Sequence, residues 1–241
     1  MRATTIVVLL LVSCSFFISC KQDAIVNSKG ASPLFQLQEG TGIDFINTVQ
    51  NTKDFNILTY RNFYNGGGVA TGDINNDGLP DVFFTSNMGP NKLYLNKGGF
   101  QFEDITEKSG IKNGGKWGTG VVFVDINSDG WLDIYVCNAG YQPGVSNENE
   151  LYINKGKTAS TDGKTGRTVQ FTEAAKEYGL NESGYTTHAA FFDYDTDGDL
   201  DCYVLKNSFM PVNTLNYANK RELRAEDWPV ADFLKGGGDK L

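Results

Sequence analysis

Three nine-residue segments of the sequence carry oxygen-bearing side chains at one regular spacing. They are DINNDGLPD (73–81), DINSDGWLD (125–133) and DYDTDGDLD (193–201). Counted from the first aspartate, Asp or Asn occupies positions 1, 3, 5 and 9, and glycine occupies position 6. Calcium is bound in proteins by several carboxylate, amide and backbone carbonyl oxygens arranged around a glycine-containing turn of this kind. Without a cation, carboxylates held this close would repel one another and raise their own pKa values.

The spacing therefore predicts three calcium loops, in which position 7 contributes its backbone carbonyl. Three solvated turns are the alternative, because Asp, Asn and Gly favour turns, but three copies with one spacing favour metal binding. Magnesium fits less well because it keeps most of its waters. The predicted ligands are Asp73, Asn75, Asp77, Leu79 and Asp81 in the first loop, Asp125, Asn127, Asp129, Trp131 and Asp133 in the second, and Asp193, Asp195, Asp197, Asp199 and Asp201 in the third.

Position 12 separates these loops from EF-hands, which place a bidentate glutamate there and lie between helices. Here position 12 is Phe84, Val136 or Val204, each within a β-like run. The loops are therefore expected to connect strands.

The flanking sequence repeats together with the loops, whose starts at 73, 125 and 193 are 52 and 68 residues apart. GGGVATGD, GTGVVFVD and GYTTHAAFFD lead into the loops, and DVFFTSN, DIYVCN and DCYVLKN follow them. NKLYLNKG and NELYINKG continue the first two copies, and the longer second spacing comes mainly from two polar insertions. Each copy reads as four short strands, the last running into a helical turn. The prediction is an all-β fold, a propeller-like array of four-stranded blades.

Three copies are too few to close a ring of about four to eight blades, so an open or partial propeller is expected. FQLQEGTGI (35–43) echoes the fourth strand of a copy, and GGGDKL (236–241) echoes the start of a third strand. The sequence is therefore expected to stop within a repeat, as a truncated array lacking a finished cap.

The D-x-[DN]-x-D-G-x-x-D loops and the GVATGD lead-in resemble the FG-GAP or VCBS repeat family, across roughly residues 34–241. The literal Phe-Gly and Gly-Ala-Pro elements are absent, so the likeness is closer to the bacterial VCBS branch. The resemblance implies a calcium-binding β-propeller like that of integrin α subunits, used for binding. Together with an export signal it also resembles bacterial surface lipoproteins, some of which carry an ASPIC/UnbV domain.

The first twenty residues form a separate unit, with Arg2 followed by an apolar run over 6–18. That run is shorter than the roughly 20 residues of a spanning helix and is typical of an export signal. Cys14 and Cys20 both follow small residues in lipobox-like settings, and Cys20 is favoured for lipidation because polar sequence begins directly after it. An ordinary cleaved signal with incidental cysteines is the alternative. The expected organisation is a signal peptide (1–20), a linker (21–33) and the repeat segment (34–241).

The composition of the chain argues against several classes of function. The formal charge of −8 argues against a nucleic-acid partner. Cys137 and Cys202 are expected to remain free, since equivalent strands would point them to opposite faces. His188 is the only histidine in the sequence, which argues against a histidine-based catalytic triad or a zinc cluster. We interpret His188 as a structural residue.

These observations favour a non-catalytic, exported calcium-binding domain at the bacterial outer membrane or cell surface. Its partner would be a glycan or protein, and it would meet the membrane only through a lipid anchor. An extracellular polysaccharide-acting enzyme and a structural spacer are the alternatives. Residues considered for a ligand surface are Trp117, Trp131, Tyr141 and Tyr185, with packing between blades as the favoured alternative for them.

Overall fold

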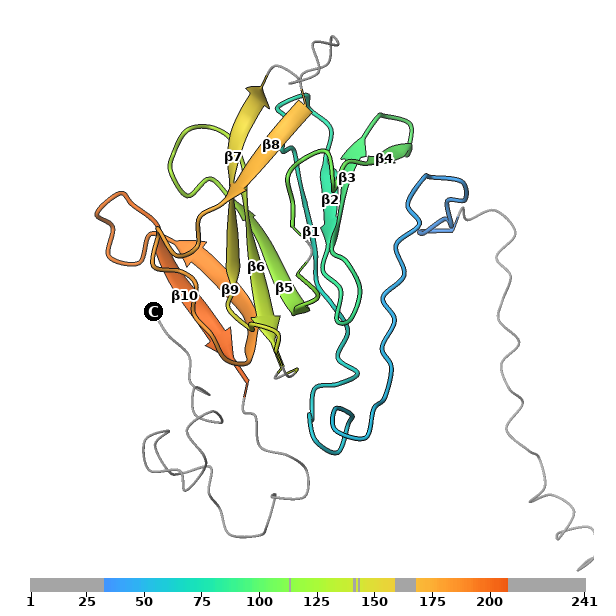
Figure 1. Ribbon diagram of the computed structural model, residues 1–241. Helices are drawn as coiled ribbons and strands as arrows, with labels where there is room; N and C mark the ends of the chain where they lie inside the picture. Colours follow the sequence, from blue (N-terminus) through green and yellow to red (C-terminus); the bar gives the residue numbers. More distant parts are fainter. Residues whose placement is uncertain (1–32, 113, 141, 143, 159–167, 208–241) are drawn as a thin grey trace, which may run out of the picture. The chain divides into compact units, whose positions relative to one another are not determined.

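The computed structural model describes residues 33–112, 114–140, 142, 144–158 and 168–207 (Figure 1). The predicted signal peptide, Cys14, Cys20, Tyr141 and the segment 236–241 lie outside these ranges. The chain divides into two compact units, 1–38 and 39–241. Of the first unit, residues 33–38 are described, and they form no strand or helix. Across the described ranges the regular structure is entirely β, and none of it forms a helix long and apolar enough to span a membrane.

The described part of the second unit contains two four-stranded antiparallel sheets, as the repeats predict, and a pair of strands from the third copy. The first sheet contains β1 (Val69–Gly72), β2 (Asp81–Phe84), β3 (Lys92–Asn96) and β4 (Phe102–Asp104), neighbouring in sequence order. The second contains β5 (Trp117–Val124), β6 (Asp133–Ala139), β7 (Glu150–Thr158) and β8 (Thr168–Glu173) in the same order. β9 (Thr186–Phe192) pairs with β10 (Asp201–Lys206). The predicted all-β, propeller-like fold is confirmed, and the described sheets form an open array.

Each predicted metal loop joins the first two strands of its sheet at the same register. The residue before position 1 pairs with position 9 in all three copies: Gly72 with Asp81, Val124 with Asp133 and Phe192 with Asp201. The aspartate loops therefore connect strand to strand, as the hydrophobic residues at position 12 predict.

Glycines in the lead-in segments let the first strands of successive sheets approach closely. A Cβ on Gly68 would lie 2.5 Å from the carbonyl oxygen of Thr119 in β5. A Cβ on Gly120 would lie 2.5 Å from the carbonyl oxygen of Thr187 in β9. Both distances are far below a normal contact, so glycine is required at these positions for β1 to pack on β5 and β5 on β9.

The second sheet is buried on both faces because its strands alternate their side chains between two cores. Ile134 and Val136 face a core shared with the first sheet. Tyr135 and Cys137 face a second core, to which β9 contributes Ala189. A strand buried on both faces loses the polar alternation of an exposed strand, which explains the continuous apolar run DIYVC.

The two described cysteines are free thiols, as predicted. The reason given by the sequence is incomplete, however. Cys137 is buried in the core between the second sheet and β9–β10, and Cys202 packs against that same core. Opposite faces of consecutive blades face one another, so pointing to opposite faces brings these side chains into one core. Burial raises the pKa of the Cys202 thiol to about 11.

An aromatic cluster at the starts of the first strands contains Phe55, Tyr60, Phe63, Trp117 and Tyr185. Trp117 and Tyr185 are each 2% exposed, so they are packing residues and not a ligand surface. The ring of Trp131 packs against Gly156 instead. Packing between blades, the favoured alternative, is therefore correct for Trp117 and Tyr185, whereas Trp131 is partly buried and packs within its own sheet.

Candidate metal centre

The three aspartate loops adopt one backbone conformation. Positions 4 and 6 have positive φ in every copy, and position 4 is never glycine. A positive φ is uncommon outside glycine, so its recurrence at position 4 marks a single built loop repeated three times. The φ angles are 55°, 56° and 63° at Asn76, Ser128 and Thr196, and 86°, 84° and 98° at Gly78, Gly130 and Gly198.

The carboxylate at position 1 lies at the centre of each turn. Asp73 accepts hydrogen bonds from the backbone N–H groups of Asp77 at 3.1 Å and Gly78 at 2.7 Å. Asp125 accepts the equivalent pair at 3.0 and 2.8 Å. Asp193 accepts one from Gly198 at 3.1 Å. The chain thus curls around this carboxylate and carries the side chains of positions 3 and 5 to the same side.

The third loop brings three carboxylates together. Oxygens of Asp193, Asp195 and Asp197 all lie within 4.8 Å of one another, and all three residues are exposed. Asp199 lies next to them, and its pKa is raised because its carboxyl is hydrogen-bonded to the Asp197 carboxyl and faces that group's charge. A divalent cation would offset this crowding of like charge.

The first two loops have asparagine at position 3, and the first of these shows an unusual oxygen. Asn75 is 5% exposed, and its amide nitrogen donates to Asp77 at 3.0 Å. Its amide oxygen is buried and has no hydrogen-bond partner among the described residues. An unpaired buried carbonyl is costly in a folded protein, and a bound cation would satisfy it. The donor set of loop 1 therefore fits a hard cation with Asn75 as a ligand, whereas in loop 2 the side-chain oxygen of Asn127 accepts the N–H of Asp129 at 3.1 Å.

Position 7 is fixed relative to position 5. The backbone N–H of Leu79 donates to the Asp77 carboxylate at 2.9 Å. In loop 2 the backbone N–H of Trp131 donates to the Asp129 carboxylate at 2.9 Å, and in loop 3 that of Asp199 donates to the Asp197 carboxylate at 3.1 Å. In each copy the residue predicted to offer its carbonyl is held against a predicted carboxylate ligand.

The aspartate at position 9 also has a structural task that the sequence analysis did not assign. Asp81 is fully buried and accepts backbone N–H groups of Ile74 at 3.0 Å and Asn96 at 2.7 Å. Asp133 is equally buried and accepts those of Ile126 at 3.1 Å and Asn154 at 2.7 Å. Each carboxylate thus ties its loop to the third strand of the sheet. The recurrence of LYLNKG and LYINKG after the loops was the available signal.

Burial raises the pKa of Asp81 to about 6, and the neighbouring Asp77 and Asp73 carboxylates add to the rise against the opposing backbone hydrogen bonds. The pKa of Asp133 is raised to about 6 for the same reasons in the second loop. Within the described ranges neither carboxylate forms a salt bridge, and a cation in the loop would supply the missing positive charge.

Two asparagines connect the first loop to the second. The amide nitrogen of Asn154 donates to the carbonyls of Ile74, in loop 1, at 2.9 Å and Leu132, in loop 2, at 3.0 Å. The amide nitrogen of Asn76 donates to the carbonyl of Gly130 at 3.0 Å. The two loops are therefore in direct contact through hydrogen bonds.

Comparison with known proteins supports the repeat interpretation. The model of a family described as FG-GAP-like repeat matches residues 73–136, from the first aspartate of loop 1 to the middle of β6. The chain is 32% identical over 144 residues to cartilage acidic protein 1 of Xenopus tropicalis, covering 59% of this chain and 20% of that protein. It is 30% identical over 142 residues to the Homo sapiens protein of the same name, covering 58% and 19%. The chain thus spans about a fifth of the length of these relatives.

Proposed function

We propose that this chain is a non-catalytic, calcium-binding repeat domain of an exported surface protein, serving adhesion or the binding of a glycan or protein. One observation carries the proposal: the three loops share one register, one positive-φ pattern and a carboxylate at position 1 that accepts loop N–H groups. The match to the FG-GAP-like repeat family supports it. The proposal assigns the clustered aspartates of the three loops to metal binding and not to acid–base chemistry.

Three ions would supply a charge of +6 against the formal −8 of the chain. They would relieve the repulsion among the exposed carboxylates of loop 3 and satisfy the buried oxygen of Asn75. Because the loops are built only in the folded chain, ion binding stabilises folding. Calcium would then set the stability of the domain and leave the strand ends away from the loops to bind a partner.

Isothermal calorimetry on the full chain tests the metal sites. We expect about three Ca²⁺ per chain and a melting temperature that rises with calcium concentration. Asp195→Ala removes a carboxylate from loop 3 and should reduce the stoichiometry by one. Asp54→Ala is the control, because Asp54 is exposed and lies outside the loops. Equal melting temperatures in calcium and in excess chelator would refute the proposal.

Trp131 allows one loop to be observed by itself. Terbium replaces calcium in oxygen-rich sites and emits when a nearby indole is excited, and Trp131 is itself position 7 of loop 2. We expect terbium emission excited through tryptophan, displaced by Ca²⁺ and lost in Trp131→Phe. The Phe variant should keep its calcium stoichiometry, because the ligand at position 7 is a backbone carbonyl.

The surface location rests on the N-terminal twenty residues. Export with lipidation at Cys20 predicts that a bacterial expression host incorporates labelled palmitate into the chain. Cys20→Ala should abolish the label, whereas Cys14→Ala should leave it. Label lost only in Cys14→Ala would move the anchor to Cys14, and absence of label in the parent chain would leave an ordinary export signal.

A further inference from the structure

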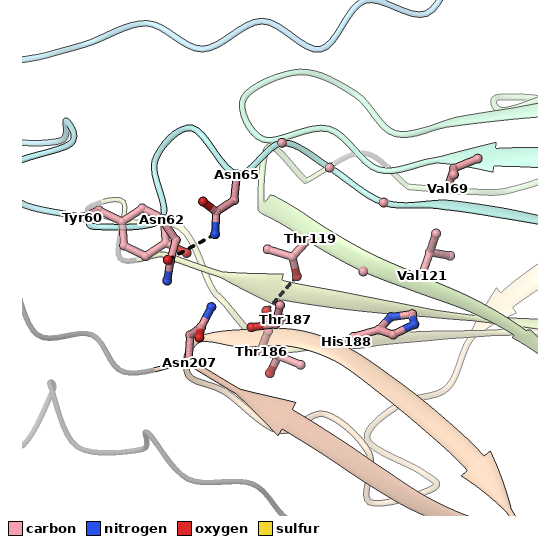
Figure 2. A pocket seen from close by; sticks show the side chains of 14 residues that line it. Tyr60, Asn62, Asn65, Val69, Thr119, Val121, Thr186, Thr187, His188 and Asn207 are labelled. Atoms are coloured by element: carbon pink, nitrogen blue, oxygen red, sulfur yellow. Dashed lines mark hydrogen bonds between the residues drawn. The ribbon is translucent and has the colours of Figure 1, made fainter. Parts of the chain in front are cut away.

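The first strands of the three sheets border a cavity of about 290 Å³ (Figure 2). Its wall comes from the early residues of β1, β5 and β9, from the segment 60–68 that leads into β1, and from Asn207 just after β10. The metal loops follow the last residues of these first strands. The cavity and the metal centre therefore lie toward opposite ends of the same strands.

The cavity wall exposes more apolar than polar surface, and it carries no Asp, Glu, Lys or Arg, although these residues make up 21% of the sequence. Its polar side chains are three asparagines, three threonines and His188. Gly66, Gly67 and Gly68 leave the backbone uncovered on one side of it. Enclosing a charged ligand without an opposing charge is costly, so the wall suits a neutral ligand rich in hydrogen-bonding groups.

Several of these polar groups are not used by the fold. Among the described residues, the Asn207 amide, the Thr187 hydroxyl and the His188 ring make no hydrogen bond. On the opposite wall, Asn65 donates to the amide oxygen of Asn62 at 3.1 Å, which orients both amides. Figure 2 shows the Asn62, Asn65 and Asn207 side chains pointing toward a common region next to Tyr60.

A sugar ring matches this arrangement. Each asparagine amide offers two donors and one acceptor side by side, which fits neighbouring hydroxyls that both donate and accept. Tyr60 borders the cavity, but its ring is buried among Phe55, Trp117 and Tyr185 and forms part of the floor of the cavity. The volume lies at the small end of the roughly 300–1,000 Å³ range of ligand pockets, so it accommodates one ring and not an extended peptide.

We propose that this cavity binds a single unit of a neutral saccharide, with Asn207 and Thr187 as hydrogen-bonding residues. This inference rests on the proposed function, for which it names the binding site and the ligand class. His188 occupies the position held by Gly68 and Gly120 in the other copies, so the third copy alone adds a side chain there.

Saturation-transfer NMR on the full chain in calcium tests the site. The probes are glucose, galactose, mannose, fucose and N-acetylglucosamine, with glucuronic acid and glucosamine as charged counterparts. We expect transfer to at least one neutral sugar and weaker transfer to the charged ones. Asn207→Ala and Thr187→Val should each weaken binding about tenfold, the loss expected when one hydrogen bond to a buried ligand is removed.

Asn181→Ala is the matched control, because this side chain lies outside the cavity and donates to Glu148. Two outcomes overturn the inference: no neutral sugar binds at tens of millimolar, or binding is the same in both cavity variants as in the parent. Calcium calorimetry on the same samples separates the two proposals. If the protein binds calcium but no sugar, only the saccharide site is rejected. If it binds no calcium, the calcium proposal is rejected.

Discussion

Replacing Asn154 by alanine should destabilise the protein more than the same change at its counterpart Asn96. Asn154 is 1% exposed and makes three side-chain hydrogen bonds: to the carbonyls of Ile74 and Leu132, and from the N–H of Gly156 at 2.9 Å. At about 1 kcal/mol for each bond, the loss is about 3 kcal/mol, and more where a carbonyl stays dry.

Asn96 holds the same place in the first sheet without a bond to another loop. Its amide donates to the Pro80 carbonyl at 2.9 Å and accepts the N–H of Gly98 at 2.8 Å, at a partly exposed position. Water can replace these bonds, so Asn96→Ala should cost about 1 kcal/mol. The expected difference of about 2 kcal/mol is the contribution of inter-loop bonding and burial.

Urea denaturation followed by tryptophan fluorescence, in saturating calcium, measures both losses. The denaturant slope should stay constant across parent and variants, so that midpoints report stability. If Asn154→Ala and Asn96→Ala lose the same free energy within about 0.5 kcal/mol, the error of such comparisons, then the link between the loops does not stabilise the fold. The reasoning about coupled blades would then be wrong.

Three further outcomes are expected. Gly120→Ala should cost about 1–3 kcal/mol by overpacking β5 against β9, whereas Gly114→Ala, where an added methyl meets only a lysine side chain at 3.8 Å, should change the urea midpoint little. In chelator, the free energy of unfolding should fall as pH rises from about 4 to 6, because Asp81 and Asp133 have a pKa of about 6 in the folded protein and bind protons less tightly in the unfolded chain. Calcium should remove this fall. A urea midpoint that rises over that pH interval in chelator would contradict the prediction. Asn76→Ala should weaken the cooperativity of ion binding between loops 1 and 2 in calorimetric titrations without changing the number of ions bound. Unchanged cooperativity would mean that this hydrogen bond does not couple ion binding in the two loops.

The periodic parts of the fold could be predicted from sequence because each copy repeats the same local rules. Loop spacing places Asp73 and Asp81 in a fixed relation, and the turn residues Asn76 and Gly78 accept the positive φ that this spacing needs. Alternating apolar residues then define the strands on either side. Three copies of one pattern predicted the loops and the strands that they join, whereas the register and the order of the strands came from the structure.

Contacts between copies could not be predicted in the same way. The burial of Trp117 depends on Phe55 and Tyr60, which come from a segment that precedes the first repeat and shows no periodicity. The shared core of Cys137 and Cys202 depends on which faces of neighbouring sheets meet. These contacts form only when neighbouring blades pack together, so the sequence of a single repeat does not predict them.

The length of the aspartate loop is constrained more tightly than the lengths of the other connections between strands. At the loop end, position 9 must satisfy backbone groups of two neighbouring elements, so a change in loop length would leave buried N–H groups of the third strand unpaired. At the other end, the connection from β6 to β7 is longer than that from β2 to β3, and glycine gives way to His188 without loss of the strand pairing. The connection from β7 to β8, which lies at the same end as the aspartate loops, is also longer than that from β3 to β4. The hydrogen bonds of position 9 therefore fix the length of the aspartate loop, while the other connections between strands differ in length from copy to copy.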